Sequence, residues 1–203
     1  MAGLIDAQGH AGCAAVVIGA SAGGVEALSV LLPMLPAGFR PALLIVMHQH
    51  PNQPSLLPEL FGARCALPVC EAEDKMPVRP GHLYLAPPDY HLLVERVPEA
   101  PEDVELALSV EPPVRFSRPS IDVLFESAAV AWRDRVLGVL LSGANDDGAR
   151  GLAMIRAAGG RAWVQSPDSA AVETMPQEAI DRGAADRVLT LEQIGQRLAQ
   201  FSE

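Results

Sequence analysis

The sequence predicts an α/β fold with a doubly wound, mostly parallel sheet and an added antiparallel hairpin region, all within a single domain. Three aliphatic runs support this prediction, because strands buried on both faces of a parallel sheet are almost entirely apolar. They are residues 15–18, 42–47 and 136–141. Apolar residues at helical spacing lie between the first two runs, so that strand, helix and strand form a βαβ unit. Glycine-rich turns follow the first and third runs, as is typical of the ligand-binding edge of such sheets.

Composition and charge restrict the classes of function. The chain has 203 residues, of which 49% are hydrophobic and 4% are aromatic, so it can bury a large aliphatic core. Its net charge of −10 argues against non-specific binding to nucleic acid or to an anionic membrane. The amino terminus lacks the basic segment and long apolar run of a signal peptide or membrane span, so we expect a cytoplasmic protein without membrane insertion. Residues 1–12 are expected to form a loose leader before a domain spanning 13–203.

The three cysteines, Cys13, Cys65 and Cys70, lack the spacing of metal ligands. We expect them to be buried free thiols in a reducing compartment, with a role in packing rather than in a zinc site or a disulfide. No motif points to a metal or another cofactor, and we expect neither.

The first strand leads into the turn that presents the main candidate residue. After the run at 15–18, Gly19 is expected to allow a sharp turn through a positive φ, and helical spacing begins at Val25. Ser21 is thereby placed at the carboxyl end of the strand. The residues from Gly19 to Gly23 fit the G-x-S-x-G pattern of a nucleophile elbow.

Two other interpretations of this turn stay open. A phosphate cradle is the less favoured of them, because the turn has neither the G-x-G-x-x-G pattern nor the lysine of a P-loop. The other is an ordinary strand-to-helix turn in which the serine caps the helix.

Two histidines follow the second strand. The run at 42–47 is succeeded by His48, Gln49 and His50. Because neighbouring parallel strands end at the same edge of a sheet, either histidine is expected to lie beside Ser21. A histidine at a strand end can also have a purely structural role.

The middle of the chain changes character. A helix at 55–61, with Pro58 in its first turn, precedes this region. Short alternating runs then predict antiparallel strands or hairpins added to the sheet, and residues 97–103 are expected to form an acidic surface loop. These runs are residues 67–69, 82–86, 92–94 and 105–109.

The last part of the chain returns to alternating strands and helices. A helix capped by Ser120 extends to residue 132 and precedes the run at 136–141. That run ends in a second glycine-rich turn with Asp146 and Asp147, after which helical spacing continues to residue 158. Further elements expected are strands at 162–165 and 186–189, a helix at 175–182, and a last helix capped by Thr190 that ends at residue 201.

Three strand ends thus carry the residue types of a hydrolytic triad. A histidine can take the proton of an attacking serine, while a carboxylate fixes the tautomer of the histidine and stabilises its cation. Backbone N–H groups at Ala22 and in the turn at 143–145 could hold an oxyanion. The order serine, histidine, aspartate argues against the α/β-hydrolase fold without excluding a triad. The candidates are Ser21, His48 or His50, and Asp146 or Asp147.

Six motifs in order along the chain resemble the catalytic domain of the CheB-type chemotaxis protein-glutamate methylesterases. They are VVIGASAGGVEAL, ALLIVMHQHP, PGHLYLAPPDYHLLVE, RFSRPSIDVLFESAA, VLGVLLSGANDDGARGL, and MPQEAI with GAAD near the end. The resemblance implies that Ser21 is the nucleophile and His48 the base, with His50 as the fallback. It also implies that Asp147 is the acid, whereas Asp146 is expected to be solvated.

Some positions depart from the family's pattern. Ala22 stands where the family often has threonine, and Ala144 and Asn145 replace residues of a T-G-M-G type turn. The backbone N–H groups of Ala22 and Ala144 are still expected to hold the oxyanion. Arg118 is expected either to steer an acidic receptor helix or to be an ordinary surface arginine. His91 is expected to be structural.

The resemblance implies hydrolysis of γ-glutamyl methyl esters on methylated chemoreceptors, with release of methanol, and deamidation of receptor glutamine by the same chemistry. The family's regulated form carries an amino-terminal receiver domain, for which the residues before the first strand leave no room. We therefore expect constitutive activity, control by a separate regulatory protein, or service in another signalling pathway. Two rival functions stay open, namely a non-catalytic binding module of the same fold and a hydrolase of other small carboxylic esters.

Overall fold

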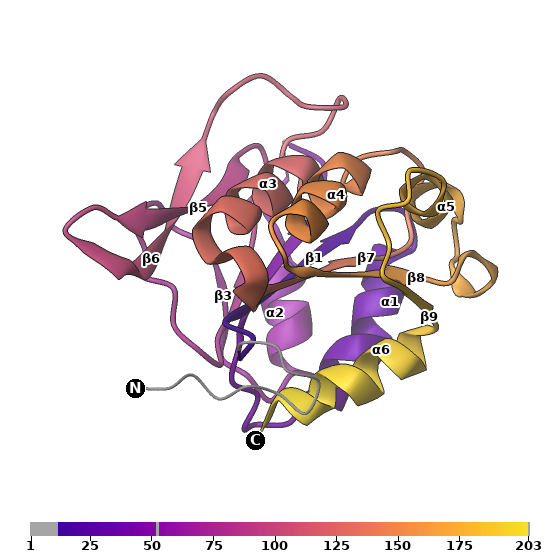
Figure 1. Cartoon of the computed structure of the whole chain (residues 1–203), viewed down its shortest axis with the longest axis horizontal. Coiled ribbons are helices and arrows are strands. Elements are labelled where there is room, and N and C mark those ends of the chain that lie inside the picture. Colours follow the sequence, from indigo (N-terminus) through magenta and orange to yellow (C-terminus); the bar gives the residue numbers. More distant parts are fainter. Residues whose placement is uncertain (1–11, 52, 203) are drawn as a thin grey trace.

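A seven-stranded parallel sheet forms the centre of the protein (Figure 1). The structure is a computed structural model that describes residues 12–51 and 53–202. The strand order is β3-β4-β2-β1-β7-β8-β9, and each neighbouring pair is parallel. The strands are β1 (Ala15–Ala20), β2 (Ala42–Met47), β3 (Val69–Glu71), β4 (Leu83–Leu85), β7 (Val136–Leu140), β8 (Arg161–Gln165) and β9 (Arg187–Leu189).

Helices cover both faces of the sheet (Figure 1), which confirms the doubly wound fold. Alternate residues of β1 point into two cores, one on each face of the sheet. Val16 and Ile18 pack with one set of helices, and Val17 packs with a second set on the other face. The first set is α1 (Gly24–Leu31), α2 (Leu57–Gly62) and α6 (Leu191–Leu198); the second is α3 (Ile121–Trp132), α4 (Ala149–Ala157) and α5 (Thr174–Asp181). Short 3-10 turns occupy Leu32–Met34, Arg133–Arg135, Pro167–Ser169 and Ala199–Ser202.

A separate antiparallel hairpin, β5 (His91–Val97) and β6 (Ala100–Ser109), confirms the predicted hairpin region. It packs against α3, and the N–H of Val94 donates to the hydroxyl of Ser127 on that helix (3.2 Å). The predicted loop at 97–103 is wrong, because β6 begins at Ala100. The proline and acidic residues at 101–103 are all exposed on this strand, where their side chains reach water.

The predicted antiparallel direction of the strands before this hairpin is also wrong. β3 and β4 extend the main sheet in parallel, with β4 paired to β2. The helix α2 provides the crossover that a parallel connection requires, and it carries the chain back to the edge at which β2 began. Both strands have only three residues, which is too short for an alternating pattern to reveal strand direction.

The other predicted elements are confirmed, with ends that differ by a residue or two, except that the last helix ends at Leu198 and is followed by the 3-10 turn at Ala199–Ser202. Thr190 caps α6 as predicted: its hydroxyl accepts from the N–H of Gln193 (3.3 Å), and the Gln193 side chain accepts from the N–H of Thr190 (3.0 Å). Within residues 12–51 and 53–202, every helix is too short or too polar to span a bilayer. The predicted leader at 1–12 lies outside the described residues except for Gly12, which is exposed.

The cysteines are free, as predicted, but they are only partly buried. Cys13 and Cys65 pack at the edge of the core that contains α1 and α6, and Cys70 packs at the edge of the other core. Burial raises the pKa of each thiol, which keeps the reactive thiolate scarce at neutral pH.

Candidate active site

Ser21 lies in the tight turn between β1 and α1, at the carboxyl edge of the sheet. Its backbone N–H donates to the carbonyl of Ser142 (2.9 Å), and its carbonyl accepts from the N–H of Gly24 (2.8 Å). Gly23 has a φ of 76°, a left-handed conformation that favours glycine. The turn is thereby fixed on both sides of the serine. No side-chain cap bond is formed at the start of α1, so Ser21 is not the ordinary capping serine of the alternative interpretation.

Gly19 is required for packing rather than for a positive φ. It lies inside β1, which continues to Ala20, and the left-handed glycine of the turn is Gly23. A Cβ on Gly19 would overlap the Cγ2 atom of Ile121, the first residue of α3. The predicted role of Gly19 in the turn is therefore wrong: the strand is longer than the apolar run suggests, and α3 crosses close above it.

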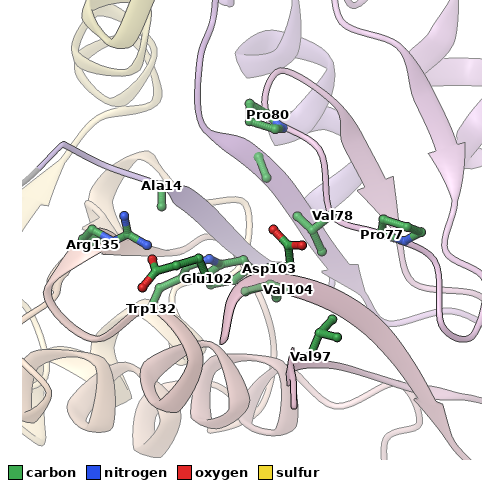
Figure 2. Close-up of a pocket in the computed structure, with 11 residues that line it drawn as sticks. Ala14, Pro77, Val78, Pro80, Val97, Glu102, Asp103, Val104, Trp132 and Arg135 are labelled. Atoms are coloured by element: carbon green, nitrogen blue, oxygen red, sulfur yellow. The ribbon is translucent and has the colours of Figure 1, made fainter. Parts of the chain in front are cut away.

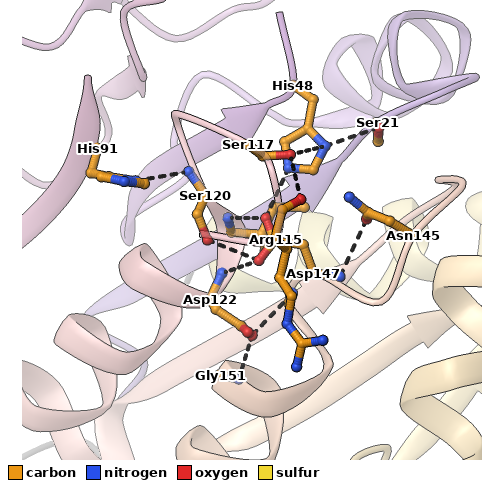
Figure 3. A network of polar contacts seen from close by, with 12 residues as sticks. Ser21, His48, His91, Arg115, Ser117, Ser120, Asp122, Asn145, Asp147 and Gly151 are labelled. Atoms are coloured by element: carbon orange, nitrogen blue, oxygen red, sulfur yellow. Dashed lines mark hydrogen bonds and ion pairs between the residues drawn. The ribbon is translucent and has the colours of Figure 1, made fainter. Parts of the chain in front are cut away.

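The neighbouring strand β2 brings His48 to Ser21. The parallel register pairs Ala20 with Met47, so that Ser21 and His48 leave the sheet as direct neighbours. The Nδ1 atom of His48 lies 3.1 Å from the Oγ atom of Ser21 (Figure 3). His50 is exposed, and no hydrogen bond among residues 12–51 and 53–202 involves its side chain. This arrangement favours His48 over His50 as the partner of the serine.

Asp147 approaches His48 from the opposite side (Figure 3). It follows β7, which pairs with the other edge of β1, and its side chain is completely buried. One carboxylate oxygen, Oδ2, lies 2.8 Å from the Nε2 atom of His48 and accepts from the N–H of Ile121 (2.7 Å). The other, Oδ1, accepts from the hydroxyl of Ser120 (2.9 Å) and the N–H of Asp122 (3.0 Å).

These donors determine the charge of Asp147. Burial alone would raise its pKa, but the hydrogen bond from His48 and those from the N–H groups of Asp122 and Ile121 outweigh it, so that the pKa lies below the usual range. The carboxylate also replaces the expected cap of α3. Ser120 is the N-cap residue as predicted, but it makes no side-chain cap bond, because its hydroxyl is directed to Asp147 instead.

A second buried acid, Asp122, has a role that the sequence pattern does not predict. Its Oδ1 atom accepts from the N–H groups of Gly148 (3.0 Å) and Gly151 (2.8 Å), the residues at and just after the start of α4. Asp147 thus caps α3 while Asp122, at the start of α3, caps α4. An acid in the first turn of a helix ordinarily suggests only a favourable interaction with that helix, so sequence spacing gave no signal for this exchange.

The predicted oxyanion donors lie on two turns that meet at Ser21. A Cβ on Gly143 would come within 3.0 Å of the Cβ of Ser21, so the second turn packs directly on the serine. The N–H of Gly143 donates to the carbonyl of Val172 (3.1 Å) and is therefore engaged. Among the hydrogen bonds of the described chain, none takes the backbone N–H of Ala22 or Ala144, and both residues are exposed.

Ser142 fixes the turn that contains Ala22. Its buried hydroxyl donates to the carbonyl of Ala22 (2.7 Å) and accepts from the N–H of Val172 (2.9 Å). Its own N–H donates to the side chain of Gln165, which is also buried (2.9 Å). These bonds hold the turns after β1 and β7 together. No local sequence pattern predicts this role for Ser142.

The other charged residues near the site make more ion pairs and hydrogen bonds than predicted. Asp146 was expected to be solvated, but its Oδ2 atom lies 2.7 Å from a guanidinium nitrogen of Arg115 and 2.7 Å from one of Arg182. Arg118 bonds to the carboxylate of Asp89 (2.6 Å) and to the carbonyls of Val110 and Glu111. These contacts give Arg118 a structural role, and its predicted role in steering a receptor helix stays a prediction. His91 is buried and accepts from the N–H of Ser120 (3.1 Å), in keeping with a structural role.

Two cavities differ in their relation to these residues. One of about 440 Å³ lies at the amino ends of β1 and β2 and is lined by Trp132, Glu102 and Arg135 among others (Figure 2). It is on the opposite edge of the sheet from Ser21. A smaller one of about 140 Å³ is lined by His48 and by the segment that precedes α3. Only the smaller cavity borders the candidate active site.

Comparison with known proteins identifies the family. The model of the CheB methylesterase family matches residues 16–198. The chain is 42% identical to a putative protein-glutamate methylesterase/protein-glutamine glutaminase of Leptospira interrogans, over 93% of this chain and 95% of that protein. It is also 42% identical to such a protein of Bradyrhizobium diazoefficiens, of which it spans 48%. Several further relatives are likewise spanned over about half of their length.

A solved structure agrees with these matches. The catalytic domain of CheB methylesterase from Thermotoga maritima superposes with a TM-score of 0.88 at 30% sequence identity, over 93% of this chain and 98% of that domain. The matched region contains Ser21, His48 and Asp147, and the fold is the doubly wound sheet with its antiparallel hairpin. The chain therefore belongs to the CheB methylesterase family.

Proposed function

We propose that this protein is a serine hydrolase that removes methyl groups from the γ-methyl esters of glutamate residues in methylated chemoreceptors or similar signalling proteins. The contact between the Ser21 hydroxyl and His48, with Asp147 behind the histidine, is the observation that carries this proposal. Family membership and the names of the relatives support the substrate class. We further propose that residues 13–203 form one catalytic domain that acts in the cytoplasm.

In the proposed reaction, Ser21 is the nucleophile and His48 the general base. Neutral His48 carries its proton on Nε2, because that nitrogen faces the carboxylate of Asp147, and its Nδ1 lone pair faces the serine hydroxyl. Nδ1 takes the proton of the hydroxyl while Oγ attacks the ester carbonyl. Asp147 holds the imidazole in this tautomer and stabilises the imidazolium cation that forms.

The tetrahedral intermediate carries a negative oxygen. The backbone N–H groups of Ala22 and Ala144 are the proposed donors, since Gly143 is already engaged with Val172. The C–O bond to the methoxy group then breaks, and methanol leaves with the proton from Nδ1 of His48. Water next attacks the acyl-enzyme with the same nitrogen as base, which restores Ser21 and releases the glutamate carboxylate.

A second activity is proposed on a specific observation. The relatives are named protein-glutamine glutaminases as well as methylesterases. The same site could act on a glutamine side chain, with ammonia in place of methanol as the leaving group. His48 would protonate that leaving group in the same way, so no further residue is needed.

The rival functions differ in what they predict for Ser21. A non-catalytic binding module has no use for a serine in contact with a histidine and a buried acid, and it would not react with a fluorophosphonate. A hydrolase of other small esters would react, and it would release methanol from small esters without a need for a protein substrate. Control by a separate regulatory protein is part of the proposal, and it would appear as activity that rises when the partner is added.

The decisive experiment measures methanol released from a chemoreceptor radiolabelled on its methyl esters. Wild-type protein is compared with Ser21→Ala and with Ser29→Ala, a matched control on α1 that lies outside the site. Release that persists in the control and vanishes in Ser21→Ala supports the proposal. Failure of wild-type protein to release methanol, together with failure of a fluorophosphonate to label Ser21, would refute it.

A further inference from the structure

The segment between β6 and α3 forms a tight two-residue hairpin beside the candidate active site. The N–H of Val114 donates to the carbonyl of Ser117 (3.1 Å), and the N–H of Ser117 donates to the carbonyl of Val114 (2.9 Å). Both central residues are left-handed: φ is 53° for Arg115 and 61° for Phe116. Such turns strongly favour asparagine and glycine at these positions, because a Cβ atom is unfavourable there. This chain instead has two of the largest side chains.

Polar contacts hold this hairpin across the edge of the sheet. The guanidinium of Arg115 pairs with Asp146, the residue before Asp147, and Arg182 of the region after α5 contacts the same carboxylate oxygen. On the other flank, the hydroxyl of Ser117 lies 3.5 Å from the Nδ1 atom of His48 (Figure 3). The hairpin is therefore tied to the turn that carries the proposed acid, and it borders the nitrogen that faces Ser21.

The aromatic side chain at the tip of the hairpin is fully exposed. Phe116 has no burial at all, although it lines the small cavity of about 140 Å³ together with His48 and Gln49. A left-handed conformation in a large residue persists only where the surroundings enforce it, and such residues cluster at functional sites. Covering an exposed aromatic ring with apolar surface removes that ring from water, which is favourable in free energy. The hairpin thus presents an apolar contact point at the entrance to the proposed site.

We infer that Phe116 is a specificity-determining residue that docks the protein substrate. Its ring contacts an apolar side chain of the substrate protein next to the esterified glutamate, while Ser21 and His48 act on the ester. The inference rests on the proposed methylesterase function. A second copy of the chain or a permanent partner on Phe116 would cover the small cavity beside His48, whereas a substrate occupies that position only during turnover.

The test compares a methylated receptor with a small glutamyl methyl ester for each variant. Phe116→Gly removes the ring and also suits the left-handed turn, so the hairpin keeps its shape. Phe116→Leu keeps an apolar side chain. Val130→Ala is the control, because Val130 is another exposed large apolar residue that lies on the far part of α3.

We expect Phe116→Gly to lower the ratio of kcat/KM for the receptor to kcat/KM for the small ester at least tenfold, mainly through a higher KM for the receptor. Phe116→Leu should recover most of that ratio, and Val130→Ala should not change it. An equal loss on both substrates, or no loss on either, would overturn the inference while leaving the methylesterase proposal intact. Absence of methanol release by wild-type protein in the same assay would refute the methylesterase proposal, and the inference with it.

Discussion

The buried carboxylate of Asp122 offers a sharp test of the site's architecture. Its substitution by alanine leaves the N–H groups of Gly148 and Gly151 without an acceptor, and both glycines are buried. Each buried donor that loses its partner costs about 1–3 kcal/mol. Removal of a desolvated carboxylate offsets part of this loss, so we expect Asp122→Ala to lower the free energy of unfolding by about 2–4 kcal/mol.

Asp122→Asn is the matched variant, because its amide oxygen can accept the same two hydrogen bonds. Burial, reinforced by the negative charge of Asp147, raises the pKa of Asp122, although the bond from Gly151 and the charge of Arg150 oppose this. A raised pKa in the folded state means that wild-type protein loses stability as pH rises from the unfolded-state pKa through the folded-state pKa. Asparagine does not titrate. The stability of Asp122→Asn relative to wild type should therefore improve between pH 4 and pH 7.

Urea denaturation of the three proteins at both pH values provides the measurement. The expected order at pH 7 places the asparagine variant within about 1 kcal/mol of wild type and the alanine variant well below both. Equal destabilisation by alanine and asparagine would show that the charge of Asp122, rather than its acceptor oxygen, holds α4. A cost below about 1 kcal/mol for alanine would show that these two hydrogen bonds contribute little to stability.

Three further predictions concern the neighbouring residues. Gly19→Ala should cost about 1–3 kcal/mol in urea denaturation, because its Cβ overlaps Ile121, whereas the exposed Gly62→Ala should not destabilise the protein. Asp147→Asn should lower kcat for methanol release by about 10⁴-fold, since the amide no longer enforces the tautomer of His48, and a loss below tenfold would contradict the proposed role. Because the folded-state pKa of Asp147 is lowered, its ionised form stabilises the protein above the usual pKa of 3.8, and this contribution is lost as pH falls through the folded-state value. The free energy of unfolding should therefore fall less steeply with decreasing pH in Asp147→Asn than in wild type.

The central strands and their edge of polar residues could be predicted because β1, β2 and β7 appear in the sequence as apolar runs. The runs at 42–47 and 136–141 are wholly apolar, and both are buried strands of the parallel sheet. Parallel strands end together, so a serine, a histidine and an aspartate after adjacent strands were expected near one another. The pairing register of Ala20 with Met47 then explains why His48, rather than His50, lies beside the serine.

Features that depend on contacts distant in sequence could not be predicted in this way. The direction of β3 follows from the crossover through α2 and that of β4 from the connection at 72–82, and neither leaves a pattern in three residues. The need for glycine at position 19 arises from Ile121, about a hundred residues later in the chain. The pairing of Asp146 with Arg115 and Arg182 likewise joins segments that local spacing cannot relate.

The two adjacent buried acids show how the structure assigns roles that the residue type leaves open. Asp147 receives four donors, including the histidine and two N–H groups at the start of α3, and its pKa is lowered despite burial. Asp122 receives two backbone donors and lies beside the charge of Asp147, and its pKa is raised. Environments that push the pKa values of two neighbouring carboxyls apart separate their chemical roles. Asp147, whose pKa is lowered, is the carboxyl in contact with His48, while Asp122 accepts the N–H bonds at the start of α4 and thereby supports the position of Asp147.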